Sequence, residues 1–177
     1  MLLRVVDIHT FYAWSHILFG VNLEVASGEV VALLGRNGAG KTTTFRSIIG
    51  LTPPKTGRVY FREEQIAGLR PYLIARKGVG YVPSGGRLFG ELTVEENLDF
   101  AGMDFSKKEL QQRKKEIKSY FDLFKNGRSN LQASYLSGGE QHQLALAMVM
   151  MKKPEFLILD EPSAGLSPGN VKTLYEI

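Results

Sequence analysis

The sequence contains no cysteine, so disulfide bridges and cysteine-based zinc sites are excluded. It also lacks a hydrophobic run long enough to cross a bilayer, since the longest one covers only residues 144–151. The first apolar stretch is interrupted by Asp7 and His9, which argues against a signal peptide. These absences predict a soluble, cytoplasmic protein.

Neither sign of charge is in large excess. The formal net charge is +4 and the pI is about 9.3, which is common among cytosolic enzymes. The densest basic segment, residues 107–118, is interrupted by Glu109 and Glu116, and its apolar residues fall on one helical stripe. It therefore predicts a helix with a solvated basic face, and we expect no nucleic-acid partner.

The apolar pattern predicts strands separated by helices. Short apolar runs bounded by glycine or proline predict strands at residues 2–8, 18–25, 30–34, 58–61, 79–82 and 156–159. Helical spacing predicts helices at residues 40–49, 71–76, 94–100, 107–124 and 138–151. This alternation favours an α/β sandwich, with a helical lobe inserted between two buried strands.

A complete G-x-x-x-x-G-K-[ST] phosphate loop occupies residues 35–42. A predicted strand enters it and a predicted helix leaves it, so backbone N–H groups and a helix N-terminus converge on bound phosphate. An ordinary glycine-rich turn with an exposed lysine would not need both flanking elements. Lys41 would neutralise phosphate oxygens, and Thr42 would offer its hydroxyl to Mg²⁺. The predicted phosphate-binding residues are Gly35, Arg36, Asn37, Gly38, Ala39, Gly40, Lys41 and Thr42.

Two carboxylates follow the last predicted strand. This position favours Asp160 as a metal ligand and Glu161 as the group beside an attacking water. Asp160 as a simple cap after a buried strand is the alternative, which would be preferred if the phosphate loop were missing.

A Ser-Gly-Gly turn precedes the last predicted helix. Ser137 can cap that helix, while Gly138 and Gly139 leave its N-terminal N–H groups open as a second anion-binding surface. One chain would then carry two phosphate sites but a single pair of carboxylates. A two-fold dimer explains this, because each Ser-Gly-Gly turn can face the partner's phosphate loop.

Together these motifs resemble an ABC transporter ATPase. Walker A lies at residues 35–42, the LSGGE-Q signature at 136–141 and Walker B at 156–161, in the family's order. The resemblance covers essentially the whole chain. It implies a P-loop NTPase fold, a three-layer α/β sandwich with an N-terminal antiparallel β element and an inserted helical lobe.

Three further phrases resemble the ATPases of branched-chain amino acid importers. They are Gly-Val-Gly-Tyr-Val-Pro at 78–83, Leu-Thr-Val-Glu-Glu-Asn-Leu at 92–98 and Glu-Pro-Ser-Ala-Gly-Leu-Ser-Pro at 161–168. The resemblance also implies that Tyr12 stacks on adenine, a role that Phe11 and Trp14 could fill on chemistry alone. The implied nucleotide contacts further include Thr43, Ser137, Gly138, Gly139 and Glu140.

The resemblance implies ATP and Mg²⁺ as cofactors and two kinds of protein partner. A second ABC ATPase chain would form a homodimer or heterodimer, and permease subunits would hold the chain at the inner face of the cell membrane. A non-hydrolysing nucleotide-binding module and the ATPase of another transporter branch are the alternatives. A soluble ABC protein acting on ribosomes or DNA would normally carry a second cassette or long inserts, and this sequence shows neither.

Two departures from the family's pattern bear on hydrolysis. Ser84 stands where the family usually has a glutamine that touches Mg²⁺ or water, and its short hydroxyl could reach the metal only through a water. The family's γ-phosphate histidine lies on a later segment, and none of His9, His16 and His142 is placed to replace it. His142 lies near the start of the predicted signature helix, so we expect it at the surface or in a helix cap.

We expect residues 1–177 to be an incomplete domain that does not turn over ATP. In the family, a strand after Walker B inserts between the strand entering the phosphate loop and the strand carrying Asp160. Without it, residues 30–34 and 156–159 would leave backbone groups unpaired, at a cost of about 1–3 kcal/mol for each buried group.

The expected organisation is therefore one ABC ATPase domain that is C-terminally incomplete. Its nucleotide-binding core would comprise residues 1–84 and 152–177, and its helical lobe, with the signature, about residues 85–151.

Overall fold

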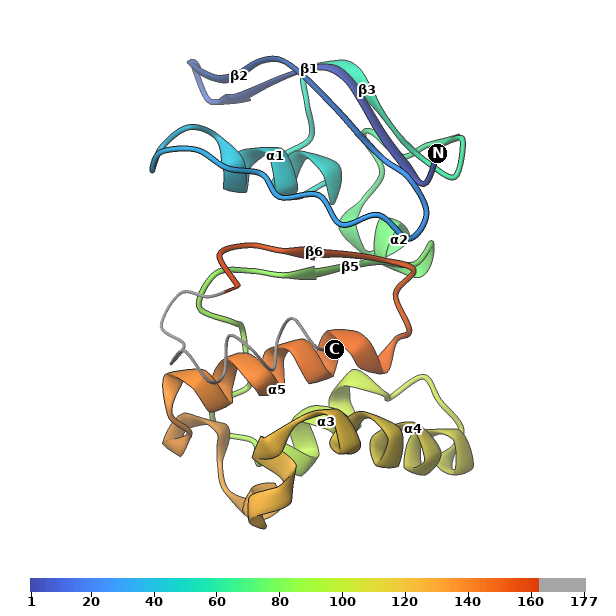
Figure 1. Ribbon diagram of the computed structural model, residues 1–177, viewed down its shortest axis with the longest axis vertical. Helices are drawn as coiled ribbons and strands as arrows, with labels where there is room; N and C mark the ends of the chain where they lie inside the picture. The colour runs from blue at the N-terminus through green and yellow to red at the C-terminus, as the bar shows by residue number, and fades with distance from the viewer. Residues whose placement is uncertain (163–177) are drawn as a thin grey trace. The chain divides into compact units, whose positions relative to one another are not determined.

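The computed structural model describes residues 1–162, with every side chain in that range except Asn126 (Figure 1). Contacts group the chain into two compact units, one formed by Met1–Val79 and the other beginning at Gly80. The predicted division into a core and a lobe bounded at residues 84 and 152 stays a prediction. None of the helices within the described residues is long and apolar enough to cross a membrane.

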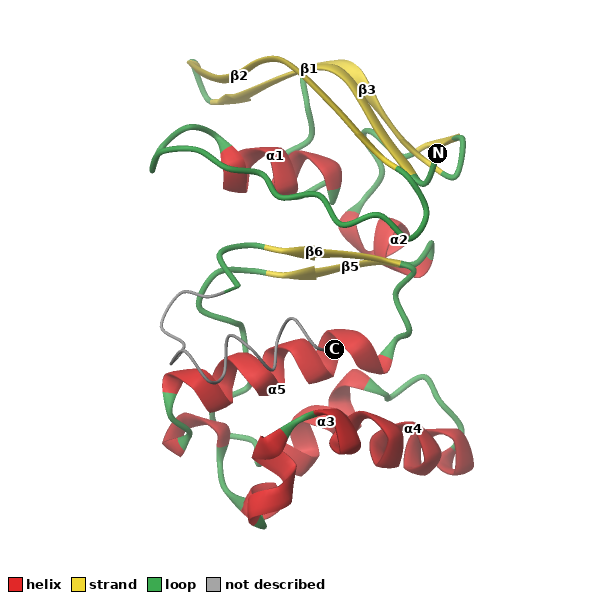
Figure 2. Cartoon of the chain, viewed as in Figure 1, coloured by secondary structure: helices red, strands yellow, loops and turns green. Residues whose placement is uncertain are grey.

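The first unit contains an antiparallel sheet with the strand order β2-β1-β3-β4 (Figure 2). Its strands are β1 (Leu3–Tyr12), β2 (Ser15–Val25), β3 (Thr56–Phe61) and β4 (Glu64–Gln65). This confirms the predicted N-terminal antiparallel element.

Strand β1 is longer than the predicted strand at residues 2–8 because a bulge resets its alternation. Leu3 and Val5 are buried, then Asp7 adopts a left-handed φ of 48°, and burial resumes at Ile8 and Thr10. The extra residue lets both halves of β1 keep an apolar face inward although the sequence alternation breaks.

Two helices complete the first unit, α1 (Lys41–Ile48) and α2 (Pro71–Arg76). Helix α1 packs against β1 and β2, and the Thr10 and Ser47 hydroxyls share a buried hydrogen bond of 2.8 Å. Ser47 also donates to the carbonyl of Thr43 one turn earlier, at 2.8 Å. These bonds satisfy polar groups that would otherwise be buried without partners.

The predicted strand at residues 30–34 is wrong. This segment belongs to no strand, and Val30 and Leu34 are 95% and 88% exposed. An apolar run becomes a strand only when a neighbouring strand accepts its backbone hydrogen bonds, and no segment among residues 1–162 does so. The sequence also predicted that the backbone of residues 30–34 would lack a pairing strand, and it pairs with none among residues 1–162.

The second unit joins a two-stranded sheet to three helices. Strands β5 (Val79–Val82) and β6 (Phe156–Leu159) pair, and Figure 2 draws their arrows pointing the same way. The helices are α3 (Val94–Ala101), α4 (Lys107–Tyr120) and α5 (Gly138–Met151). Three short 3₁₀ turns lie between α4 and α5, at Asp122–Asn126, Arg128–Asn130 and Ala133–Tyr135.

All three helices of the second unit begin with a capping box. In each, the N-cap hydroxyl accepts from the N3 backbone, and the N3 glutamate accepts from the N-cap N–H. The three pairs are Thr93 with Glu96, Ser106 with Glu109, and Ser137 with Glu140. Helix α4 ends four residues before the predicted boundary because Phe121 is extended, with φ −120° and ψ 133°.

The basic face of α4 is not simply solvated, which corrects the prediction for residues 107–118. Lys114 is buried and pairs with Glu95 and Asp99 of α3, each at 2.5 Å. Arg113 is also buried and donates to the carbonyls of Met150 and Met151 at the end of α5. These cations join α4 to α3 and α5, and the positive charge of Arg113 suits a helix C-terminus.

His142 lies in the interior of the second unit, so the prediction of a surface position was wrong. The residue is 5% exposed, and its Nε2 is buried without a hydrogen-bond partner. Ser137 supplies the helix cap instead. Burial lowers the pKa of His142, because the charged imidazolium loses its hydration.

This burial predicts that stability falls in mild acid. The unfolded chain binds the His142 proton below a pH of about 6.5, whereas the folded chain binds it only at lower pH. The contribution of neutral His142 should thus be present above pH 6.5 and be lost as the pH falls below it. Urea unfolding should show that the free energy of unfolding falls less between pH 7.5 and pH 5.5 for His142→Leu than for the parent. The difference should not exceed the effect of one additional proton bound by the unfolded chain. Equal losses in both proteins would contradict the buried, neutral histidine.

Candidate nucleotide site

The phosphate loop is shaped by two left-handed glycines. Gly38 has φ 82° and Gly40 has φ 96°, conformations that other residues rarely adopt. A Cβ atom at Gly40 would also lie 2.8 Å from Leu18 Cδ2 of β2. Between the glycines, the backbone N–H of Ala39 donates to the carbonyl of Arg36 at 3.1 Å. The loop therefore reverses tightly just before α1.

Helix α1 begins without a side-chain cap. Gly40 is its N-cap and has no side chain to accept from the first turn, in contrast to the capping boxes of α3, α4 and α5. The first turn also contains no acidic residue. A helix start of this kind presents N–H groups and the positive end of the helix dipole to an anion.

Lys41 lies across the loop that precedes it. Its ammonium group donates to the carbonyl of Gly35 at 2.8 Å and to that of Arg36 at 3.1 Å. The cation is therefore held beside the uncapped turn in an exposed position. Both the charge and the N–H groups that phosphate recognition requires lie within the eight predicted residues.

Tyr12, predicted to stack on adenine, is anchored by its hydroxyl to the region of α1. The Arg46 guanidinium donates to Tyr12 Oη at 3.5 Å. Hydrogen bonding with Thr52, followed by the contacts with Arg46 and Thr43, lowers the Tyr12 pKa. Thr43 is buried and contributes to the lowered pKa of Tyr12, and its predicted contact with nucleotide stays a prediction.

The three candidate aromatic residues differ in their freedom to meet a ligand. The Phe11 ring stacks on His16 with centroids 4.1 Å apart, so its face is already covered. Trp14 is 98% exposed at the turn between β1 and β2. Tyr12 is 40% exposed and fixed at its hydroxyl end. A half-exposed, anchored ring is the better preorganised surface, which supports Tyr12 over the other two.

The two predicted carboxylates lie directly after β6 and face hydroxyl groups from the end of β5. Asp160 is buried, donates its backbone N–H to Val82 at 3.0 Å and accepts from the Tyr81 hydroxyl at 3.2 Å. Glu161 is exposed and accepts from the Ser84 hydroxyl at 3.1 Å. Because β5 and β6 end together, these groups gather at one edge of the sheet.

Glu161 has a backbone conformation that is unusual for a side chain with a Cβ. Its φ of 52° is left-handed, which is strained for a non-glycine residue and is often found at functional sites. Neither the Tyr81 contact nor the Ser84 contact was predicted from the sequence. The only available signal was that both residues carry hydroxyls near the end of a strand paired with Walker B.

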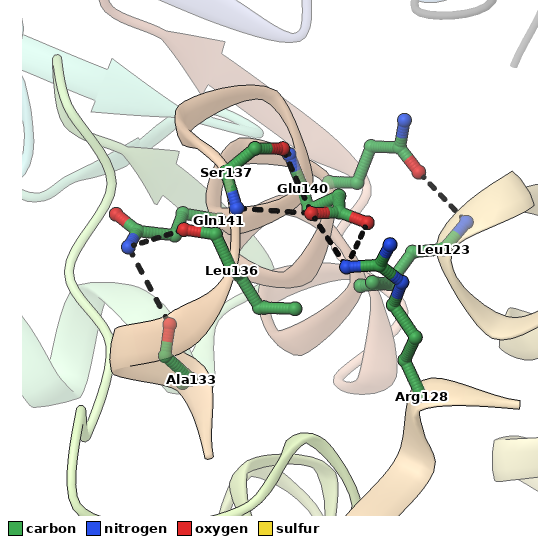
Figure 3. Close-up of polar contacts among 8 residues, drawn as sticks. Leu123, Arg128, Ala133, Leu136, Ser137, Glu140 and Gln141 are labelled. Atoms are coloured by element: carbon green, nitrogen blue, oxygen red, sulfur yellow. Dashed lines mark hydrogen bonds and ion pairs between the residues drawn. The ribbon is translucent and has the colours of Figure 1, made fainter. Parts of the chain in front are cut away.

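The signature turn starts α5 with a closed polar network (Figure 3). Ser137 donates both its backbone N–H and its hydroxyl to Glu140 Oε2, at 2.9 and 2.8 Å. Arg128 pairs with the same carboxylate, 3.0 Å from Oε1. Gln141 donates to the carbonyls of Leu136 and Ala133, which fixes the chain entering the helix.

In this network, the Glu140 carboxylate is bound by Ser137 and Arg128 at the start of α5. Burial would raise the pKa of Glu140, but hydrogen bonds from Ser137 and the charge of Arg128 outweigh it and lower the pKa. Open space surrounds Gly138, where an added Cβ would meet nothing within 4 Å. Whether Ser137, Gly138, Gly139 and Glu140 contact nucleotide stays a prediction. Arg128 was not predicted from the sequence, and Gln141 was predicted only as a member of the signature.

The predicted site residues are divided between the two units. The phosphate loop, Thr43 and Tyr12 lie in the first unit, and the carboxylates, Ser84 and the signature lie in the second. The phrase at residues 161–168 that resembles branched-chain importers lies, from residue 163 onward, outside the described residues.

Comparison with known proteins identifies relatives over nearly the whole chain. The sequence is 38% identical over 170 residues to the high-affinity branched-chain amino acid transport ATP-binding protein BraG of Pseudomonas aeruginosa, covering 96% of this chain and 72% of that protein. It is 36% identical over 177 residues to the probable branched-chain amino acid transport ATP-binding protein LivF of Archaeoglobus fulgidus, covering 99% and 74%.

Solved structures of ABC transporter ATP-binding subunits have a similar fold. A solved ATP-binding subunit of an ABC transporter superimposes with a TM-score of 0.86 at 32% identity, covering 99% of this chain and 72% of that one. This confirms the predicted fold class. Residues 18–164 match the family described as ABC transporter. The chain therefore belongs to the ABC transporter family, as an ATP-binding subunit.

Proposed function

We propose that this protein binds and hydrolyses Mg-ATP to energise an ABC importer for branched-chain amino acids. The observation that carries the proposal is the uncapped start of α1, which follows a left-handed glycine turn and has the Lys41 ammonium beside it. The solute follows from BraG and LivF, both of which are named for branched-chain amino acid transport.

Nucleotide recognition would use the first unit. The phosphates would lie on residues 35–42, where backbone N–H groups and Lys41 offset their charge. Adenine would stack on Tyr12, whose anchored hydroxyl limits the motion of its ring. Thr43 would support the loop from beneath, because its side chain is buried next to Tyr12.

Mg²⁺ fits the chemistry of the residues assigned to it. Thr42 offers a hydroxyl and Asp160 a carboxylate, and both are hard oxygen donors of the kind that Mg²⁺ prefers. No group of three or more acidic or histidine side chains within residues 1–162 is arranged to hold a metal, so phosphate oxygens and water would complete the shell. The bound ion would offset charge on the β- and γ-phosphates.

Glu161 would act as the general base. A water oxygen attacks the γ-phosphorus as one of its protons passes to the Glu161 carboxylate, and the bond from phosphorus to the bridging oxygen of ADP breaks. The products are ADP and inorganic phosphate. The exposed carboxylate at the end of β6 supports this role, because it can meet a water from solvent.

Two protein partners complete the proposal. Ser137, Gly138, Gly139 and Glu140 would face the phosphate loop of a second ABC ATPase chain, identical or related, so that ATP closes a two-chain sandwich. Permease subunits would receive the motion and hold the protein at the cytoplasmic face of the membrane. The open surroundings of Gly138 support an interface at the signature turn.

A non-hydrolysing nucleotide-binding module is the alternative, and the observation that favours it is Ser84 in place of the usual glutamine. ATP affinity together with ATP turnover separates the two functions, because the module would bind ATP and not consume it. The expectation that residues 1–177 bind ATP without turnover also stays a prediction.

The first prediction of the proposed function concerns ATP binding. Lys41→Ala should weaken Mg-ATP binding about 10- to 100-fold, because a hydrogen bond to a charged group contributes roughly 1.5–3 kcal/mol. Lys115→Ala, which removes an exposed lysine of α4, is the matched control and should keep the parent affinity. Isothermal titration calorimetry gives both values. Unchanged binding in Lys41→Ala would remove the phosphate loop from the proposal.

The second prediction concerns hydrolysis, in a version extended by the C-terminal segment of BraG. Glu161→Gln should keep ATP affinity and lower turnover about 10²- to 10⁴-fold, because an amide cannot accept the proton. The ATP-bound dimer should then persist in light scattering. Turnover equal to the parent's would refute the base assignment, and a monomer at high concentration with ATP would refute the dimer.

A further inference from the structure

The carboxylate of Glu161 needs a partner to have a fixed position. Glu161 is exposed, and its side chain has several rotatable bonds. The left-handed backbone therefore fixes the direction of the Cα–Cβ bond and not the position of the carboxylate. The partner in the structure is the Ser84 hydroxyl, which donates to Oε2 at 3.1 Å. The neighbouring carboxylate, Asp160, is held in the same manner by the Tyr81 hydroxyl.

We propose that Ser84 is a positioning residue for Glu161, whose carboxylate it holds by a direct hydrogen bond instead of serving the metal. This inference rests on the proposed role of Glu161 as the base. It reverses the expectation that Ser84 reaches Mg²⁺ through a water. A hydroxyl donates one hydrogen bond, and here that bond goes to the carboxylate.

The turn that carries Ser84 is itself fixed. The N–H of Gly86 donates to the carbonyl of Pro83 at 3.0 Å, which closes the turn, and Gly86 has a left-handed φ of 62°. A Cβ atom at Gly86 would lie 3.1 Å from the Ala145 Cβ of α5 and 3.7 Å from the Gln141 carbonyl. The turn therefore packs closely on the helix that begins with the signature.

This packing gives the position of Ser84 a physical origin. Because Gly86 rests on α5, the distance from Ser84 to Glu161 depends on how the turn sits on that helix. A side chain at residue 86 would push the turn away and lengthen the hydrogen bond. The structure thus connects the signature helix to the base through two residues, Gly86 and Ser84.

The test uses residues 1–177 with ¹³C-labelled glutamate. At one fixed pH, the Glu161 carboxyl resonance, assigned by its loss in Glu161→Gln, should shift in Ser84→Ala and return towards the parent value in Ser84→Thr, which restores a hydroxyl. Ser119→Ala, which removes an exposed serine of α4, should leave the resonance unchanged. A resonance that does not move in Ser84→Ala overturns the proposal.

Kinetics in the extended version give the second readout. Ser84→Ala should lower kcat about tenfold or more with unchanged KM for ATP and unchanged Mg²⁺ requirement, because the base is misplaced while the nucleotide contacts remain. Ser84→Thr should recover most of the loss. A change in Mg²⁺ requirement with unaltered kcat would overturn the proposal in favour of a metal role.

Glycine variants test whether the packing of this turn on α5 positions Ser84. Gly86→Ala should shift the same resonance, whereas Gly68→Ala should not, although Gly68 has an equally left-handed φ of 82°, because open space surrounds it. Equal shifts of the resonance in Gly86→Ala and Gly68→Ala would contradict a role for the packing of this turn on α5. A parent that binds Mg-ATP but never turns it over would count against the proposed hydrolysis, and the resonance alone would then decide the role of Ser84.

Discussion

Helix α1 starts at Gly40, which has no side chain to accept from the first-turn N–H groups, so the N-cap residue cannot close this helix start. Two left-handed glycines bring the chain tightly into this turn, and Lys41 lies back over the loop carbonyls. The neighbouring sheet enforces the arrangement, because a larger residue at position 40 would collide with Leu18. The proposed binding of phosphate by this chain would depend on that open helix start.

The signature helix solves the same problem in the opposite manner. Its start is closed by Ser137 and Glu140, with Arg128 holding the carboxylate from outside (Figure 3). A closed start is stable without a ligand, whereas an open start gains stability when an anion binds. The contrast distinguishes the loop that would hold ATP from the turn that would meet a partner's nucleotide.

Local sequence determined much of what could be predicted. The phosphate loop, the helix at residues 138–151 and the strand before Asp160 each combine turn residues with apolar periodicity inside one short window. The strand predicted at residues 30–34 was wrong for the opposite reason, because a strand needs a distant partner that an apolar run does not specify. The burial of Lys114 and His142 likewise depends on packing between helices.

The contacts around the two carboxylates show the same limit. Asp160 and Glu161 were predicted from their place after a strand, but Tyr81 and Ser84 meet them only because β5 and β6 end side by side. The identity of Ser84 indicated a departure from the family, and its new partner became visible only in three dimensions.

A crystal structure of residues 1–177 with Mg²⁺ and a non-hydrolysable ATP analogue tests the nucleotide site most directly. The Lys41 ammonium should leave the Gly35 and Arg36 carbonyls and contact the β- and γ-phosphate oxygens, with the phosphates on the first-turn N–H groups of α1. A nucleotide bound away from α1, or Lys41 still bonded to its own loop beside the phosphates, would contradict the assignment.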